Sequence, residues 1–216
     1  MHIWEGTLSV TPHGQAVLIA GAAAGALGTA IGLSKMDYQR IPQVAVLSSA
    51  FFVASSIQVP LPPSSVHLML TGLMGLVLGW AAFPAVLVAL VLQGIFVSVV
   101  LGGPTTLGLN TVVMALPAVA MYYLFYYPVR SSRQTIVFLS GFAAGATAIL
   151  LSALLAWTAL TLSGKEFVPV AHALVLGHLP VALIEGLVTG SVVVLLRKVR
   201  PEVLAAPLLA AFPQKI

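Results

Sequence analysis

The chain has 216 residues, of which 60% are apolar and 6% charged, and its mean hydropathy is +1.10. Soluble domains carry about 25% charged residues, so this composition excludes a soluble protein and predicts one polytopic membrane domain over residues 1–216. The net charge of +4 lies in short loops, where it indicates topology rather than nucleic-acid binding, and the absence of cysteine excludes disulfides and thiolate chemistry.

The first feature in chain order is the N-terminal segment 1–13, which begins Met1-His2. No basic stretch precedes the first apolar span, so we expect no cleavable signal peptide and an intact N-terminus. The Met1 α-amine, the His2 amide nitrogen and the His2 Nδ1 can then close fused chelate rings around one cation. With a second imidazole as the fourth ligand, this planar set suits Ni(II) or Cu(II). The alternative is a disordered terminus without function.

Seven apolar stretches follow, each close to the roughly 20 residues that a helix needs to cross a bilayer. They are predicted at residues 14–34, 43–60, 66–82, 84–101, 109–128, 135–162 and 170–196. The third and fourth meet at Phe83-Pro84 with almost no loop, which predicts a tight helical hairpin. The predicted fold class is therefore an all-α bundle of seven transmembrane helices.

A strip of small residues occupies one face of the first span. Ala22, Ala26 and Ala30 recur four residues apart, which places them above one another on a helix. Such a strip lets a second helix approach closely. Two interpretations stay open: packing within the same bundle, and docking to a partner membrane protein.

Two segments between the spans are unsuited to helix: 58–65 is rich in proline and serine, and 102–108 is rich in glycine. Irregular backbone near a membrane is tolerated where it is buried or lines a cavity. We expect both segments to wall a site beside the N-terminus, ordinary turns being the alternative. His67 follows the first segment at the head of the third span, where an interfacial hydrogen-bonding role competes with a ligand role. His13 precedes the first span, where we expect a solvated side chain.

Further polar side chains lie within the apolar spans. His172 and His178 are near the outer end of the last span, and Glu185 lies two turns from His178 on roughly the same face. Ionisable groups inside spans are functional candidates, so a proton relay and a structural pair are both possible for His178 and Glu185. Asn110 and Gln93 fit groups that orient imidazoles, and they fit interhelical hydrogen bonds equally well.

The basic residues of the loops predict the orientation of the chain. They fall into three groups, namely Lys35 and Arg40, Arg130 and Arg133, and Arg197, Lys198 and Arg200. All three groups share one side of the membrane if there are seven spans. The positive-inside rule then places the C-terminal tail 198–216 in the cytoplasm and the N-terminus outside the cell membrane.

Several blocks of the sequence, in order and over nearly the whole chain, resemble one known family. They are Met1-His2-Ile3-x-Glu5-Gly6-x-Leu8-Ser9, His67 with the span after it, Thr105-Thr-Leu-Gly-x-Asn110, Ile184-Glu-Gly-Leu-x-Thr-Gly190, and the arginine-rich stretch before Pro201-Glu202. In these blocks the chain is similar to the NikM/CbiM family, the nickel- and cobalt-specific S components of energy-coupling factor (ECF) transporters. The N-terminal block is the most specific of them.

The resemblance implies a core of six helices preceded by an extra N-terminal helix, with Met1, His2 and His67 holding Ni²⁺ or Co²⁺ as the transported substrate. It also implies partners, namely a transmembrane coupling subunit, two ATPase subunits and, as a further candidate, a small accessory membrane subunit. The chain itself has no nucleotide-binding loop. We therefore predict the capture subunit of an ATP-driven nickel or cobalt importer, without enzyme activity of its own.

Two other classes of function compete with this prediction. A self-contained secondary transporter or channel would use His178 and Glu185 for proton-coupled movement of a small solute. A membrane-embedded enzyme is disfavoured because the sequence has no GxSxG, HExxH or carboxylate cluster. The residues do not distinguish nickel from cobalt, since both metals accept nitrogen ligands.

Overall fold

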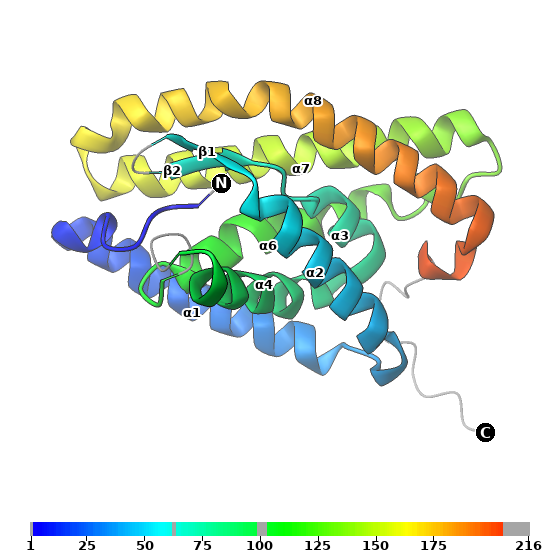
Figure 1. Ribbon diagram of the computed structural model, residues 1–216, viewed down its shortest axis with the longest axis horizontal. Helices are drawn as coiled ribbons and strands as arrows, with labels where there is room; N and C mark the ends of the chain where they lie inside the picture. The colour runs from blue at the N-terminus through cyan, green and yellow to red at the C-terminus, as the bar shows by residue number, and fades with distance from the viewer. Residues whose placement is uncertain (1, 62–63, 99–102, 205–216) are drawn as a thin grey trace.

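The computed structural model describes residues 2–61, 64–98 and 103–204, and it is mostly helical (Figure 1). A 3₁₀ turn at Leu8–Val10 leads into the first helix. The α-helices are α1 (Pro12–Ser34), α2 (Ile41–Ser56), α3 (Thr71–Leu78), α4 (Ala82–Phe96), α6 (Leu107–Phe125), α7 (Gln134–Ser163) and α8 (Val168–Val199). Two short strands, β1 (Gln58–Leu61) and β2 (Ser64–His67), lie between α2 and α3.

Within the described ranges, five helical stretches are long and apolar enough to cross a membrane. They are Pro12–Ser34, Thr71–Phe96, Leu107–Phe125, Gln134–Ser163 and Lys165–Val199. Helix α2 has 16 residues and is shorter than the usual spanning length. A helical membrane fold is therefore confirmed, and the count of seven spans stays a prediction.

The structure corrects the predicted second and third spans, because a β-hairpin takes the place of helix between them. Strands β1 and β2 pair in antiparallel register, with Gln58 opposite His67 and Leu61 opposite Ser64. Pairing across the hairpin satisfies backbone groups of a proline-containing segment that could not satisfy them in a helix. The second span consequently ends at Ser56, and the bundle is not entirely α-helical.

The start of α3 is fixed by a distant side chain. Glu185 on α8 accepts the backbone N–H groups of Met69 and Leu70, the latter at 2.7 Å. Leu70 adopts a φ of +54°, which a helix cannot continue. Helix α3 therefore begins only at Thr71, and His67 lies on a strand rather than two residues into a helix.

The turn between the predicted third and fourth spans also lies elsewhere. Helix α3 ends at Leu78, the following Gly79 has a φ of +56° that favours glycine, and a 3₁₀ turn at Gly79–Ala81 leads directly into α4. The break between the two helices is thus at Gly79 and not at Phe83-Pro84. Helix α4 ends at Phe96, and the remaining predicted positions up to 101 fall partly outside the described residues.

Helix α1 packs against the bundle through glycine. Its buried face is a ridge of glycines that includes Gly21, Gly25, Gly28 and Gly32. A Cβ on Gly25 would lie 2.7 Å from the carbonyl oxygen of Gly108 on α6, so the two backbones approach closely. The three residues of the alanine strip, Ala22, Ala26 and Ala30, are exposed on the surface of the bundle. Internal packing therefore depends on the glycines, and the alanine face is left for another contact.

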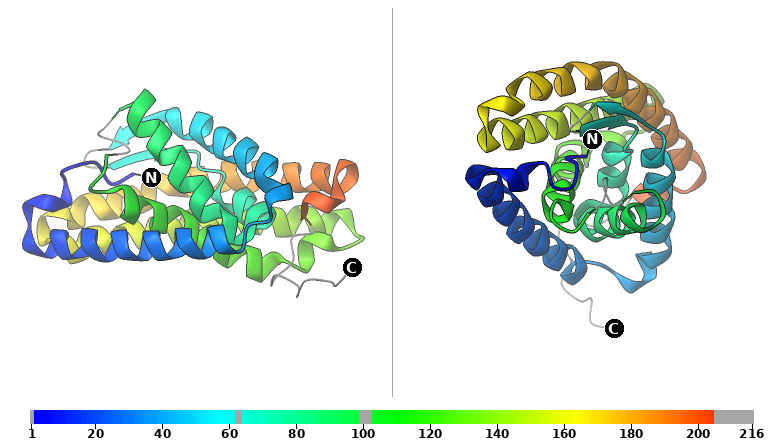
Figure 2. Two further views of the ribbon diagram at one scale, coloured as in Figure 1. Left: turned by 90° about the horizontal axis from the view of Figure 1, so that it is seen from below. Right: turned by 60° about the vertical axis from the view of Figure 1, so that its left-hand side comes forward.

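The basic loop segments meet at one end of the bundle. The guanidinium of Arg40 donates to the carbonyl of Val203 at 3.5 Å, and that of Arg130 donates to the carbonyl of Leu204. Arg197 donates to the carbonyl of Arg130 at 3.0 Å. These loops therefore lie together at one end of the bundle, and their placement on the cytoplasmic side stays a prediction. The N-terminal segment enters the bundle from the opposite end and lies inside the ring of helices (Figure 2, right).

Candidate metal-binding site

The two histidines predicted as ligands lie against each other inside the bundle. His2 is fully buried, and His67 on β2 is 3% exposed. Their rings are stacked, with centroids 4.5 Å apart and planes inclined by 29°. Met1, the third predicted ligand residue, lies outside the described residues. The structure thus brings His2 and His67 together from segments far apart in the sequence.

The His67 ring is held in a defined tautomer. Its Nδ1 lies 2.9 Å from the carbonyl oxygen of Leu68. Because a carbonyl oxygen only accepts, Nδ1 carries the hydrogen and Nε2 carries the lone pair. Histidine ligands commonly donate their other ring N–H in this way, which fixes the orientation of the ring.

Burial keeps both imidazoles neutral. It lowers the pKa of His2 and the pKa of His67 well below the usual value, and the neighbouring His2 ring lowers the pKa of His67 further. The side chain of Gln93 opposes the effect at His2, but burial outweighs it. Each ring therefore has a lone pair at neutral pH, which is the form that binds a metal ion.

Gln93 combines the two roles predicted for it as alternatives, a group near an imidazole and an interhelical hydrogen bond. From α4 its Nε2 donates to the carbonyl of Ser55 on α2 at 3.0 Å, and the side chain is buried. It is also a polar neighbour of the His2 ring. Gln93 is thus both an interhelical hydrogen-bonding residue and part of the surroundings of the candidate site.

Asn110 holds the N-terminal segment by its backbone. Its Oδ1 accepts from the Ile3 N–H, and its Nδ2 donates to the Ile3 carbonyl, both at 3.0 Å. Both residues are buried. Asn110 therefore acts on the backbone next to His2. These bonds are neither a contact with an imidazole nor a hydrogen bond between two helices, which were the two roles predicted for it.

Glu5 is a second anchor of the N-terminal segment. Its carboxylate accepts the backbone N–H of Thr105 at 3.1 Å and that of Thr106 at 3.4 Å, just before α6 begins. A Cβ on Gly103 would lie 2.3 Å from the Glu5 carboxylate, so a larger residue there would displace the Glu5 side chain. The sequence predicted no anchoring role for Glu5, and its place in the N-terminal block was the available signal.

His178 and Glu185 do not form the pair considered for them. The His178 Nδ1 lies 2.8 Å from the carbonyl of Leu174, one turn earlier on α8. Among the described residues, no group bonds to the His178 Nε2 or to the Glu185 Oε2. The other Glu185 oxygen binds the backbone after β2. Glu185 thus holds the segment that follows His67.

The two remaining histidines are exposed. His13 lies in the first turn of α1, and His172 lies on α8 with its ring centroid 6.0 Å from that of Trp157. The solvated side chain expected for His13 agrees with this placement.

Comparison with known proteins decides the family. A family model described as CbiM, the cobalt uptake substrate-specific transmembrane region, matches residues 2–203. The chain belongs to the CbiM family. It is 41% identical over 210 residues to a Haemophilus influenzae protein named for metal transport, covering 94% of this chain and 97% of that protein.

Other members and solved structures agree with this assignment. A cobalt transport protein CbiM of Sorangium cellulosum is 34% identical over 175 residues, or 76% of each chain. The crystal structure of a truncated transition metal transporter is similar with a TM-score of 0.72 and 25% identity, covering 92% of this chain and 99% of that one. These relatives and the solved structure are named as transport proteins or transporters.

Proposed function

We propose that this CbiM-family chain is the substrate-binding membrane subunit of a nickel or cobalt importer, and that His2 and His67 hold the ion. The observation that carries the proposal is the buried, stacked pair of neutral imidazoles, 4.5 Å apart. Imidazole is the commonest protein ligand of transition metals, and two neutral rings in contact can be ligands of one ion. The family description, cobalt uptake, supports a divalent transition metal as the substrate.

The ligand set that fits these residues has four nitrogens. Met1 supplies its α-amine, His2 supplies its amide nitrogen and Nδ1, and His67 supplies Nε2. Binding releases protons, because the amine and the amide must both lose one. The lone pair of each imidazole nitrogen lies in the plane of its ring, whereas the stacked His2 and His67 rings face each other. At least one ring must therefore turn for both to bind the same ion.

The metal is nickel or cobalt in this proposal. Both accept imidazole and amide nitrogens, and the usual affinity order places nickel only one step above cobalt. A planar set of four nitrogens favours nickel among the two. The names of the relatives, which refer to cobalt, keep cobalt as the second substrate.

The proposal includes the assembly of an ECF transporter. Seven spans, a core of six helices preceded by α1, would place the N-terminus outside and the tail 198–216 in the cytoplasm. The cluster of basic loops at one end supports this orientation. A transmembrane coupling subunit and two ATPase subunits, with a small accessory membrane subunit as a further partner, would drive reorientation of the chain and release the ion inward. The exposed alanine face of α1 supports the coupling contact.

Metal analysis of the purified chain with its native N-terminus tests the proposal. We expect one nickel ion per chain and no measurable binding in His2→Ala. In His67→Ala we expect the nickel affinity to fall by more than the roughly 100-fold caused by loss of a residue that supports a metal ligand. The exposed His13 provides a matched control, since His13→Ala should bind as the unmodified chain does. Unchanged nickel affinity in His2→Ala would remove the proposed site.

A further inference from the structure

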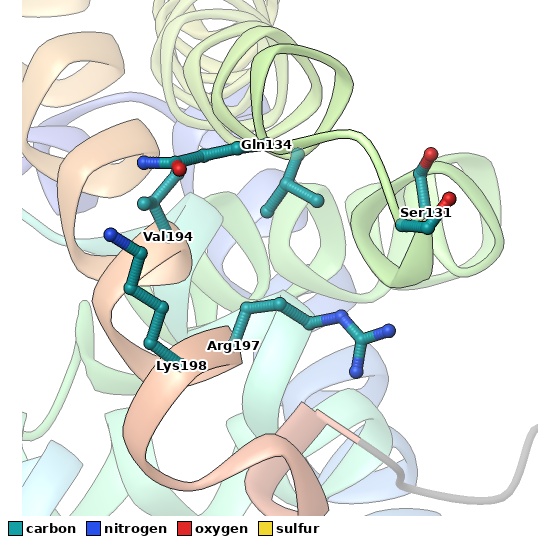
Figure 3. Close-up of a pocket in the computed structure, with 7 residues that line it drawn as sticks. Ser131, Gln134, Val194, Arg197 and Lys198 are labelled. Carbon is teal, nitrogen blue, oxygen red and sulfur yellow. The ribbon is translucent and has the colours of Figure 1, made fainter.

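A pocket of about 290 Å³ lies at the basic end of the bundle, between the start of α7 and the end of α8 (Figure 3). Arg197 and Lys198 project from α8, and Ser131 and Gln134 lie across from them at the start of α7. The proposed transport function uses none of these residues. Their chemistry therefore needs a separate explanation.

The polar lining of this pocket suits an anion. Arg197 donates one N–H to the carbonyl of Arg130 at 3.0 Å, which orients a guanidinium that has five donors in all. Lys198 adds a second positive charge, and the hydroxyls of Ser131 and Ser132 add donors. None of the residues that line the pocket is acidic. Guanidinium, ammonium and hydroxyl groups together are the donors that bind phosphate.

A second cavity continues the first along the same pair of helices. It has a volume of about 520 Å³ and shares Gln134 and Val194 with the first. Its lining also includes Thr135, Phe138 and Ser191, and none of its lining residues is charged. Ser191 precedes Arg197 by six residues, which is about 9 Å of helix. A charged pocket at the end of the bundle thus leads into an uncharged groove that runs toward the middle of the membrane.

We propose that these joined cavities bind an anionic phospholipid of the cytoplasmic leaflet. The headgroup phosphate occupies the pocket with Arg197 and Lys198, and an acyl chain follows the groove beside Phe138 and Val194. The positive-inside rule requires only that the cytoplasmic loops be basic, and it does not require them to line a cavity. Here the basic side chains line a cavity that opens onto an uncharged groove with Phe138 and Val194 in its lining, and this order matches the charged headgroup and the uncharged remainder of a lipid. The site is independent of which metal the chain carries.

Native mass spectrometry of the full chain, released from nanodiscs of equal phosphatidylglycerol and phosphatidylcholine, tests the proposal. The unmodified chain should retain phosphatidylglycerol preferentially. Arg197→Gln/Lys198→Gln should reduce that preference roughly thirtyfold, since each basic residue near the membrane surface contributes roughly fivefold. The control Lys165→Gln/Arg200→Gln removes the same charge outside the pocket and should keep the preference.

A second variant separates a lipid from free phosphate. Ser191→Trp fills the groove and leaves the charged pocket unchanged, so it should weaken retention of phosphatidylglycerol about tenfold or more. Stabilisation of the chain by added inorganic phosphate, measured as the melting temperature, should be the same in Ser191→Trp and in the unmodified chain. This variant also decides the question if the charge variant does not fold.

Three results would overturn the lipid site. The first is equal retention of the two lipids by the unmodified chain, and the second is equal loss in the charge variant and its control. The third is full retention of phosphatidylglycerol by Ser191→Trp, which would indicate that the pocket binds phosphate alone.

Discussion

Single residues build this site largely by binding backbone. Asn110 and Glu185 hold the main chain next to His2 and after His67, and Glu5 ties the segment that carries His2 to the backbone before α6. Hydrogen bonds to a charged group contribute about 1.5–3 kcal/mol, so such anchors can offset the entropy of fixing an N-terminus. The positions of the two imidazoles thus depend on residues that do not touch a metal.

Glu185 gives the sharpest prediction at this scale. Glu185→Gln retains an oxygen that can accept from Met69 and Leu70, so we expect nickel affinity within about threefold of the unmodified chain and continued uptake. Glu185→Ala removes the carboxylate that accepts from the Met69 and Leu70 N–H groups, and the loss of such an acceptor costs about 1–3 kcal/mol. We expect that variant to lose at least tenfold in affinity, as measured by calorimetry.

The same pair of variants separates positioning from proton transfer. An amide cannot carry a proton in a relay, so a relay through Glu185 requires loss of uptake in Glu185→Gln. That outcome would support the proton-coupled carrier and contradict the positioning role.

The sequence singled out His2 and His67 as candidate ligands because both stand in recognisable positions, one at the terminus and one after an irregular segment. It could not identify the partner of Asn110, because Ile3 is 107 residues away and both groups are uncharged. Contacts of this range depend on the completed fold. Only the membership of Glu5 and Asn110 in the resembling blocks indicated a role for them.

At the scale of elements, α1 presents two different faces. The glycine ridge packs inward so closely that a single methyl group would collide with α6, and the alanine face stays exposed. Neighbouring positions of the same helix should therefore respond to substitution in opposite ways.

Gly25 and Ala26 test the two faces of α1. Gly25→Ala puts a Cβ 2.7 Å from the Gly108 carbonyl oxygen and should lower the melting temperature of the isolated chain by several degrees. Ala26→Leu should leave the melting temperature and nickel binding unchanged but weaken co-purification with the coupling subunit, because close helix approach needs small side chains. Full co-purification of Ala26→Leu would count against docking through this face.

The sequence predicted element boundaries well only where a continuous apolar run coincides with a helix. Hydropathy predicted the long helices α1, α6, α7 and α8 well, since each is a continuous apolar run. It failed between residues 57 and 70, because an apolar strand and an apolar helix have similar hydropathy. It also could not find the end of that segment, which depends on Glu185, 115 residues after Leu70.

At the scale of the whole molecule, the two ends of the bundle differ in character. One end gathers the basic loops and the joined cavities of α7 and α8, and the other receives the N-terminal segment. The segment that begins with His2 lies inside the ring of helices, beside the hairpin that carries His67 (Figure 1). This polarity is what a protein that takes up an ion from one side requires.

The orientation in the membrane can be measured with cysteines, because the chain has none of its own. Val10 is 74% exposed, and the Glu202 side chain is 60% exposed. In intact cells, an impermeant maleimide should label Val10→Cys, and it should label Glu202→Cys only after lysis. Labelling of both positions from the same side would contradict the count of seven spans.

The measurement that tests the central claim most directly is the visible absorption of the nickel complex when one alanine is inserted between Met1 and His2. The claim is that the α-amine, the His2 amide and the two imidazoles hold the ion together. The insertion lengthens the chelate by one peptide unit and adds a further amide nitrogen, which should displace His67. We predict a changed absorption spectrum, loss of uptake, and an affinity that no longer responds to His67→Ala. An identical spectrum with unchanged uptake would contradict the proposed site.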